Sequence, residues 1–532
     1  MGINQSKAYD AIVVGAGHNG LTAGAYLAKA GLSVLILEAR SIVGGACVTE
    51  EVAAGKSVSS CSYIASMLRP TIVADLKLPE FGLEMIPCDP YFSVATPDGS
   101  LLTWWSDPDR TATEIERFSK VDAAAFLRVD KELKQLATYL QPFFLEGPPD
   151  LAGQGWSRIS SALKTAGRFV GISGPETAAL MDFITGSTGE FLDRNFENDT
   201  VKKLFLANNV YGKHGGPYDP GTAIGFLFHL LGGGDNKIQG FSGHVIGGMG
   251  TITKALAASA ESLGAEIRVS SPVKKIDVKD GRTTGVTLEN GDHIPSDLVL
   301  SNADPKRTFL HLVPKSATDI AFRTRIKSIK MKGPSGKLNL ALSSEPNLIL
   351  QPDTATPNER AVFTDVPTLE EAQKSYHQSQ EGLIPERLWV DYVIPSYIDK
   401  TLAPEGTWMM TCFIQYLPYD LKDGDWDSRS EELSDRVIKQ LTRFIPNLPD
   451  IIEAKKLLTP LDLERTYGLT EGNIFHGDLS LSQLFFMRPT PDCSQYSTPV
   501  KGLYLCGAGT HPGGGVTGAP GHNAAKKVLK DR

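Results

Sequence analysis

The residues of this 532-residue chain with the clearest chemical meaning are three glycines and one acid near its start. Gly15, Gly17 and Gly20 form a G-x-G-x-x-G pattern, and Glu38 follows close to 20 residues later. In such a pattern the first glycine permits a tight turn, the second lets a pyrophosphate approach the backbone, and the third lets a helix pack against a strand. An acid at this offset hydrogen-bonds a ribose 2′-hydroxyl. The spacing therefore predicts a dinucleotide site.

The segments around the glycines have the patterns of a strand, a helix and a second strand. Residues 9–14 are apolar and β-branched, residues 21–30 have helical spacing, and residues 33–37 form another apolar run that ends at the acid. The phosphates would then lie at the N-terminus of the helix. Because an acid at Glu38 favours an unphosphorylated ribose, the residues indicate FAD or NAD rather than NADP.

Two later segments have patterns that would return the chain to this unit. In the first, a helix that opens at residues 247–250 precedes a strand near Ile267, short strands with Asp-Gly and Asn-Gly turns, and a buried strand. In the second, a strand at 502–506 precedes a tight turn, a glycine-rich loop and a terminal helix that starts near Val516. No second G-x-G-x-x-G follows a strand, and residues 231–240 are interpreted as a loop.

The predicted fold class is α/β, with a Rossmann-like domain of the glutathione-reductase type interleaved with a second α+β domain. We expect the first, discontinuous domain to comprise residues 1–70, 236–305 and 455–532. Residues 71–235 and 306–454 then form a substrate domain, helical in its first half and strand-rich in its second. A substrate cavity is expected where the two domains meet.

Composition limits the kinds of partner. The 61 acidic and 53 basic residues give a net charge of -8, so no chain-wide attraction for nucleic acid is expected. No apolar run approaches the ~18 residues of a membrane span, and neither a signal peptide nor an Arg-rich presequence is recognised. The six cysteines include no C-x-x-C pair and no metal-ligand spacing, which predicts reduced thiols and no metal site.

Several motifs along the chain resemble one family. They are "VVGAGHNGL", "GGACVTEE", "CSYIASMLRP", "GGMGTITKAL", "VLSNADP", "GNIFHGDLSLSQLFFMRP" and "GLYLCGAGTHPGGGVTGAPGHNAA". Together they run from residue 11 to residue 525. The chain resembles the phytoene desaturase and carotenoid isomerase group of FAD oxidoreductases, and within it the branch called pyridine nucleotide-disulfide oxidoreductase domain-containing protein 2. The disulfide chemistry in that label has no thiol pair to perform it here.

The resemblance implies that the cofactor is FAD. The double glycine after Glu38 is typical of flavoproteins of this type, and the family places the residue at Val273 beside the adenine. The cofactor-binding residues that we expect are Gly15, Gly17, His18, Asn19, Gly20, Glu38, Ala39, Arg40, Gly44, Gly45, Ala46, Val273, Gly507 and Val516.

The family relatives remove or relocate hydrogens on long apolar polyenes. The resemblance therefore implies a dehydrogenase or desaturase that transfers a hydride from an extended isoprenoid- or carotenoid-like substrate to flavin N5. A redox-neutral isomerase or a ketolase is one alternative. Another is an FAD-binding protein that acts through a protein partner, in mitochondria as the animal members suggest. The expected location is accordingly the cytoplasm or the mitochondrial matrix.

No catalytic triad is expected, because this chemistry needs at most one weak base. The candidate proton-transfer residues are His476 and His511, and the alternative interpretation is that both bond loop carbonyls. Arg69, Met249 and Arg488 are candidate flavin or substrate contacts.

Three aromatic pairs, Trp104–Trp105, Phe143–Phe144 and Phe485–Phe486, are interpreted chiefly as core, with a substrate tunnel or peripheral membrane contact as alternatives. The expected partners are an apolar small molecule and an electron acceptor or protein partner. The substrate, the acceptor and the oligomeric state stay open.

Overall fold

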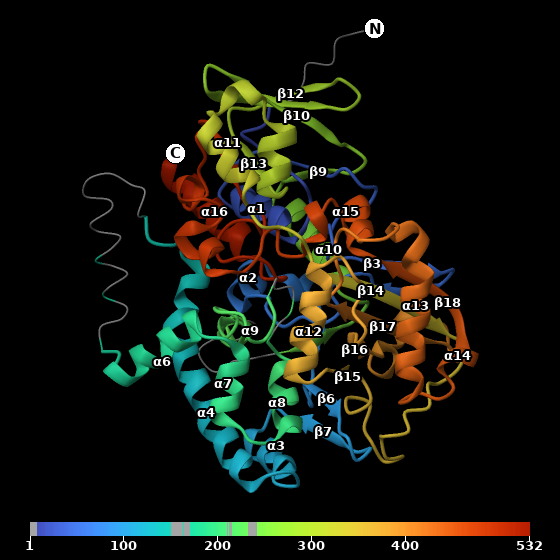
Figure 1. The fold of residues 1–532 in the computed structure, drawn as a ribbon. Coiled ribbons are helices and arrows are strands. Elements are labelled where there is room, and N and C mark those ends of the chain that lie inside the picture. Colours follow the sequence, from blue (N-terminus) through green and yellow to red (C-terminus); the bar gives the residue numbers. More distant parts are fainter. Residues whose placement is uncertain are drawn as a thin grey trace.

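The computed structural model describes residues 8–150, 163, 167, 171–209, 211, 215–231 and 242–532. The chain forms two lobes, and segments distant in sequence alternate between them (Figure 1). One lobe is built on a five-stranded parallel sheet and the other on a seven-stranded mixed sheet. The loop predicted at residues 231–240 lies almost entirely outside the described residues.

The parallel sheet has the strand order β19-β13-β1-β2-β9, so the first strand of the chain lies at its centre. Its strands are fully paired in parallel, and β1 and β2 are buried throughout, which explains their continuous apolar sequences. The strands are β1 (Ala11–Val14), β2 (Val34–Leu37), β9 (Glu266–Arg268), β13 (Val299–Ser301) and β19 (Leu503–Leu505).

Both faces of this sheet are covered. Helices α1 (His18–Lys29), α10 (Gly250–Ser262) and α16 (Ala519–Asp531) share one apolar core with alternate residues of β1 and β2. The other face packs against the antiparallel strands β10 (Val273–Lys279), β11 (Arg282–Leu288) and β12 (His293–Pro295) and against α11 (Ile320–Lys327). A π-helical turn at Arg307–Leu312 joins this layer.

The seven-stranded sheet has the order β18-β14-β17-β16-β15-β6-β7 and is antiparallel except between β15 and β6. Helix α13 (Trp426–Thr442) buries one face of β14, β16 and β17. The strands are β6 (Phe92–Ala95), β7 (Leu101–Trp104), β14 (Ser335–Leu342), β15 (Val362–Asp365), β16 (Trp389–Val393), β17 (Trp408–Gln415) and β18 (Ile452–Leu458).

A group of helices packs at the β6–β7 end of this sheet around buried phenylalanines. They are α3 (Pro108–Ile115), α4 (Lys120–Leu140), α6 (Gly174–Thr185), α7 (Thr188–Asn195), α8 (Asp199–Leu206), α9 (Ile224–Leu230) and α12 (Leu369–Gln380). The remaining elements are α2 (Pro70–Asp75), α14 (Leu448–Ile451), α15 (Pro460–Tyr467) and the strand pairs β3 (Thr49–Ala53) with β4 (Lys56–Ser59) and β5 (Met85–Pro87) with β8 (Gly243–Val245).

The mixed α/β architecture with a Rossmann-like unit is as expected from the sequence. Two local expectations differ. The terminal helix begins at Ala519 and not near Val516, because Gly513, Gly515 and Gly518 have positive φ angles that no helix accommodates. Strands β6 and β7 extend the second sheet from within a region predicted to be mostly helical. The division into domains at the stated boundaries stays a prediction.

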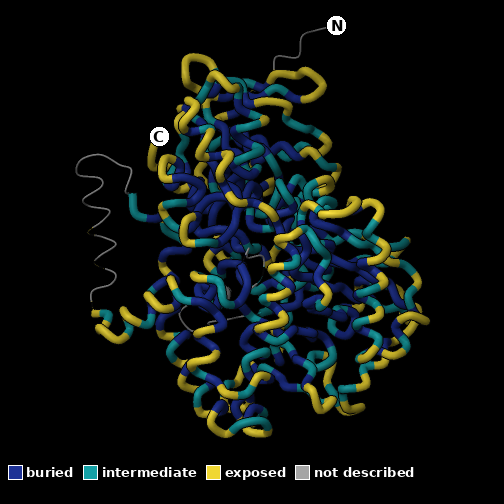
Figure 2. Tube along the Cα trace, viewed as in Figure 1, coloured by how far each residue is buried: buried dark blue, intermediate teal, exposed yellow. Residues whose placement is uncertain are grey.

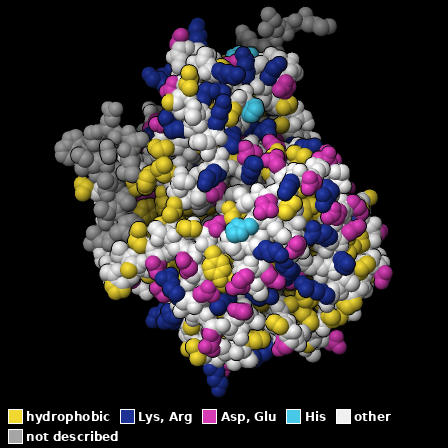
Figure 3. Space-filling view, in the orientation of Figure 1, with side chains coloured by type: hydrophobic (Ala, Val, Ile, Leu, Met, Phe, Trp, Pro, Cys, Tyr) yellow, Lys and Arg dark blue, Asp and Glu magenta, His cyan; other side chains and the backbone are white. Residues whose placement is uncertain are grey.

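Buried residues occupy the centre of both lobes and the region between them, while exposed residues concentrate in peripheral turns (Figure 2). Positive and negative side chains are interspersed over the face in Figure 3. Within the described part of the chain, no helix is both long and apolar enough to cross a membrane, and no group of potential metal ligands occurs. All six cysteines are free.

We expect Phe205→Ala to destabilise the protein by about 3–5 kcal/mol, because it leaves a cavity at the centre of an aromatic cluster. Phe205 is fully buried, and its ring centroid lies 4.6 Å from that of Phe196 and 5.0 Å from that of Trp104. Thermal unfolding followed by circular dichroism measures the effect. The control, Val121→Ala, removes a 65% exposed side chain and should change stability by less than ~0.5 kcal/mol. Equal changes in the melting temperature of the two variants would contradict the central packing role of Phe205.

Candidate active site

Four parallel strands end at one edge of the first sheet, and the residues that follow them form the start of a cavity. Gly15 follows β1, and its N–H donates to the carbonyl of Leu37 at the end of β2. Asn302 follows β13, and its N–H donates to the carbonyl of Val14. Cys506 follows β19 and donates to Ser301 in the same way. In open α/β sheets, ligands bind outside the carboxyl ends of the strands.

Glu38 lies at this edge, one residue beyond β2. Its Oε2 accepts the backbone N–H of Ala16 at 2.8 Å, and its Oε1 accepts that of Arg40 at 2.9 Å. These bonds fix a buried carboxylate and leave each oxygen with further acceptor capacity. The Arg40 guanidinium pairs with Glu50 at 2.5 Å and lies 4.9 Å from the ring centroid of Tyr467.

The glycines bring backbones into contact. Gly17 forms a parallel bridge with Gly44, and the Gly44 N–H donates to Ala16 at 2.8 Å. A Cβ on Gly20 would lie 2.1 Å from the carbonyl oxygen of Gly15, a distance that no side chain permits. Because Gly17 caps α1 without any side-chain hydrogen bond, the N–H groups of the first turn remain for an anion.

A single cavity of about 760 Å³ runs from these strand ends to the second sheet. Its lining includes twelve of the fourteen expected cofactor-binding residues: Gly15, Gly17, His18, Asn19, Glu38, Ala39, Arg40, Gly44, Gly45, Ala46, Val273 and Val516. Gly20 and Gly507 are outside the lining and serve close packing, since a Cβ on Gly507 would lie 2.5 Å from the Asn302 oxygen. Their roles in binding stay predictions.

The histidines occupy different places. His18 and His476 line the cavity, whereas His511 does not. His511 is buried, and its Nε2 donates to the carbonyl of Phe143 at 2.7 Å. Burial lowers the pKa of His18 and of His511 to about 4, and it also lowers the pKa of His476. The imidazoles of His18 and His511 are therefore neutral at pH 7, and the catalytic role of the histidines stays a prediction.

None of the three candidate flavin or substrate contacts lines the cavity. Arg69 donates to the carbonyl of Leu231 at 2.6 Å, and Met249 packs in the core beneath α10. Arg488 is only 1% exposed. It donates to five backbone carbonyls, those of Phe475, Gly477, Asp478, Gln483 and Ala508. Arg488 thus holds together the glycine-rich segments behind the cavity.

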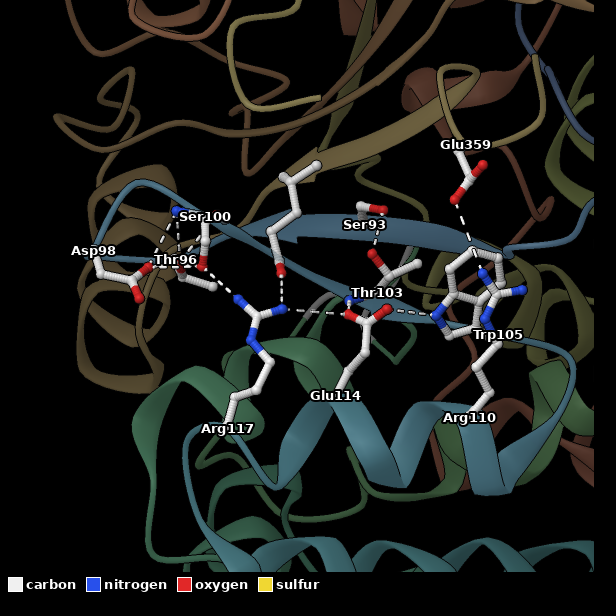
Figure 4. A network of polar contacts seen from close by, with 11 residues as sticks. Ser93, Thr96, Asp98, Ser100, Thr103, Trp105, Arg110, Glu114, Arg117 and Glu359 are labelled. Atoms are coloured by element: carbon white, nitrogen blue, oxygen red, sulfur yellow. Dashed lines mark hydrogen bonds and ion pairs between the residues drawn. The ribbon is translucent and has the colours of Figure 1, made fainter. Parts of the chain in front are cut away.

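An aromatic wall lines the second lobe's part of the cavity, and it includes Trp104 and Trp105, which the sequence indicated chiefly as core. Figure 4 shows how residues of α3 hold this part of the wall. Glu114 accepts the Trp105 indole N–H at 2.7 Å and the Thr103 backbone N–H at 3.0 Å, while the Arg110 guanidinium lies over the Trp105 ring. The indole ring of Trp105 is therefore fixed in place.

Two ionisable residues on this side of the cavity were missed by sequence reasoning. Lys337 on β14 is 2% exposed, and its Nζ has no hydrogen-bond partner among the described residues. Asp391 on β16 is 3% exposed. Burial lowers the pKa of Lys337 to about 7 and raises that of Asp391 to about 6. The available signal was a charged residue inside an apolar strand, in "GKLNLAL" and "LWVDYVIP".

Comparison with known proteins identifies the family. Residues 105–529 match the flavin-containing amine oxidoreductase profile, and residues 13–72 match an NAD(P)-binding Rossmann-like domain. The chain belongs to the flavin-containing amine oxidoreductase family. Its members are FAD-type oxidoreductases, so the family and cofactor inferred from the motifs are confirmed.

Individual relatives agree with this placement. The chain is 36% identical to pyridine nucleotide-disulfide oxidoreductase domain-containing protein 2 of Rattus norvegicus, over 98% of this chain and 94% of that protein. It is 27% identical to a component of the limonene dehydrogenase of Castellaniella defragrans (99% and 96%) and to the phytoene desaturase of Fusarium fujikuroi (98% and 89%). The solved structure of putrescine oxidase with putrescine has a TM-score of 0.60 at 15% identity, covering 99% of each chain, and shows a shared fold.

The residues present fit FAD. Asn19 is 2% exposed, and its Oδ1 has no partner among the described residues although it lines the cavity, so a polar group of a ligand is needed there. The uncapped first turn of α1 can hold a pyrophosphate, and Glu38 can accept ribose hydroxyls. Val516 and Gly515 also line the cavity, and the Gly515 carbonyl lies 3.1 Å from Nε2 of His18 at the start of α1.

We expect Glu38→Gln to weaken FAD binding about 10-fold or more, because an amide NH₂ would then face a backbone N–H that now donates to a carboxylate. The dissociation constant of FAD, measured by flavin fluorescence with the apoprotein, tests this. Glu80→Gln at an exposed site is the control. Unchanged affinity in Glu38→Gln would contradict the assignment of the acid to the ribose.

Proposed function

We propose that this oxidoreductase dehydrogenates an extended, mainly apolar substrate of isoprenoid type. The observation that supports this most directly is the continuity of one cavity from the FAD-binding strand ends to the aromatic wall of the second sheet. Trp104, Phe92, Phe363 and Phe413 give that wall the apolar surface that a hydrocarbon chain requires. The relatives named limonene dehydrogenase and phytoene desaturase support an isoprenoid skeleton.

FAD, when bound, supplies the two-electron acceptor to which a hydride from the substrate goes. The residues of the chain must then bind the substrate, exclude water and take up the proton that balances the loss of hydrogen. Lys337 is the residue that we propose for this last task. Lys337 lines the cavity, and its buried Nζ has no hydrogen-bond partner among the described residues and lies 3.9 Å from the ring centroid of Tyr63. With a pKa of about 7, much of Lys337 is the neutral amine at physiological pH and can accept a proton there.

The first experiment is anaerobic mixing of the FAD-loaded protein with isoprenoid hydrocarbons, alcohols and amines of increasing length. Loss of the oxidised flavin absorbance, together with a product two hydrogen atoms lighter than the substrate, is the expected result. A product of unchanged mass would show isomerisation instead. Failure of every compound to reduce the flavin would contradict the proposed dehydrogenation.

We expect Lys337→Met to slow flavin reduction by about 100-fold or more, the contribution typical of a positioned base. In the unchanged protein the rate should rise with pH through about 7 and then level off, because deprotonation of Lys337 generates the base. Lys337→Met should abolish this rise. The rate of flavin reduction at several pH values measures both effects.

Two further variants make the result specific. Lys332→Met, at an exposed ion pair with Asp420, should leave the rate and its pH dependence unchanged. Asp391 has a pKa of about 6 and shares the cavity, so the rise must also survive in Asp391→Asn. Persistence of the rise in Lys337→Met would remove Lys337 from the proposed role.

The Lys337→Met variant is also expected to change the stability of the protein. Between pH 7 and about 10 the unfolded chain holds the proton of Lys337 while the folded protein does not, so this residue makes stability rise with pH in that window. Below pH 7 the burial penalty is present in full. We therefore expect Lys337→Met to raise the melting temperature more at pH 6 than at pH 9, as measured by calorimetry. Equal shifts at both pH values would contradict the lowered pKa.

A further inference from the structure

We propose that Arg307 binds the diphosphate of FAD and supplies the positive charge that this group requires inside the cavity. The inference concerns the cofactor and does not depend on the substrate proposed above. An esterified diphosphate is a dianion, whereas the N-terminus of α1 contributes the equivalent of only about half a positive charge. Because burial of a charge without a counter-charge is costly, a cation of the cavity wall is needed.

Five lysine and arginine side chains line the cavity. Three of them already form ion pairs: Arg40 with Glu50, Arg465 with Asp427 and Lys134 with Asp130. The fourth, Lys337, belongs to the second sheet. The fifth is Arg307, whose guanidinium makes no hydrogen bond or ion pair with any residue that the structure describes. The Nε of Arg307 is buried as well.

A π-helical turn presents Arg307 to the cavity. Hydrogen bonds in such a turn join residues five apart, and here the Val313 N–H donates to the carbonyl of Thr308 at 2.9 Å. Arg307 and Leu312 therefore lie one turn apart on the same side, and both line the cavity. Thr308 and Phe309 are fully buried. Turns of this kind are rare and occur frequently at functional sites.

The carboxylates near Arg307 are engaged elsewhere. Oδ1 of Asp304 accepts the backbone N–H of Arg307 at 2.9 Å, and its Oδ2 accepts the hydroxyl of Thr470 at 2.5 Å. Glu471 pairs with Lys306 at 2.7 Å. Since none of these carboxylates forms an ion pair with the guanidinium, the described part of the chain leaves the charge of Arg307 available to a ligand.

The surroundings of Arg307 connect it to the first turn of α1. His476 lies within electrostatic range of both Arg307 and His18, the first residue of that helix. Asn302, at the end of the strand that precedes the π-helical turn, packs against the glycine-rich turn, because a Cβ on Gly17 would lie 2.8 Å from its Nδ2. Arg307 is thus associated with the segments that are expected to hold the phosphates.

The chemistry of the side chain suits a diphosphate. A guanidinium is planar, remains charged at every physiological pH and presents donors in a fork that can engage two phosphate oxygens at once. A lysine would supply the same charge from a single point. The proposed contact therefore predicts a difference between these two residues at position 307.

The test measures the dissociation constant of FAD with the apoprotein from the change in flavin fluorescence. We expect Arg307→Met to weaken FAD binding about 10- to 100-fold, the range of hydrogen bonds to a charged group. Arg307→Lys should recover part of this loss. The affinity of the unchanged protein should fall as KCl is raised, and the fall should be smaller in Arg307→Met because one charge–charge interaction is missing.

Two fragments of the cofactor and one control variant locate the effect. ADP-ribose carries the same esterified diphosphate as FAD, whereas adenosine carries no phosphate. In calorimetric titrations, Arg307→Met should weaken the binding of ADP-ribose and leave that of adenosine unchanged. The control, Arg325→Met, removes an arginine that pairs with Asp492 outside the cavity lining, and it should change neither FAD affinity nor its dependence on KCl.

Unchanged FAD affinity in Arg307→Met would overturn the assignment. An affinity loss with the KCl dependence of the unchanged protein would also overturn it, because it would indicate general damage to the site. If Arg307→Met did not fold, as judged by circular dichroism of the apoprotein, Arg307→Lys would decide, and full FAD affinity in that variant would contradict the forked contact. None of these results requires a substrate, so they stand apart from the test of dehydrogenation.

Discussion

The structure depends on one constraint, the close approach of backbones at the carboxyl ends of the parallel strands. Gly20 packs on the Gly15 carbonyl, Gly17 bridges to Gly44, and the peptide of Asn302 lies against Gly507. Any side chain at Gly20 or Gly507 would push these segments apart. Because the same contacts set the positions of Glu38 and the first turn of α1, they fix the residues that are expected to hold FAD.

The second lobe contributes a different kind of constraint. Its sheet carries a row in which Lys337 and Asp391 flank Phe413 across three adjacent strands. Burial of unlike charges without a direct pair costs stability, and protein cores generally avoid it. This row lies on the wall of the cavity that the expected FAD-binding residues also line, which supports the proposed role in proton transfer.

The sequence predicted much of the cofactor lobe because its signals are local. The turn at Gly15, the helix after it and the acid at Glu38 occur within thirty residues, and few residues other than glycine permit the conformation of that turn. Lys337 and Asp391 could not be paired in this way, since their proximity follows from the order β14-β17-β16, which differs from the order along the chain. For Arg488 the local sequence was misleading. Its position before a proline suggested a ligand contact, but its side chain donates to five backbone carbonyls. These carbonyls lie in loops that only the fold brings together.

The strand order of the first sheet also bears on the order in which its parts can form. Its central strand β1 pairs with β2 from nearby in the sequence, whereas its edge strand β19 and the segment around Val516 are separated from β1 by most of the second lobe. These distant residues complete the wall of the cavity that Gly15 and Glu38 begin. Contacts of such long sequence separation require closure of a long loop, so closure of the cavity is expected to be a late step of folding.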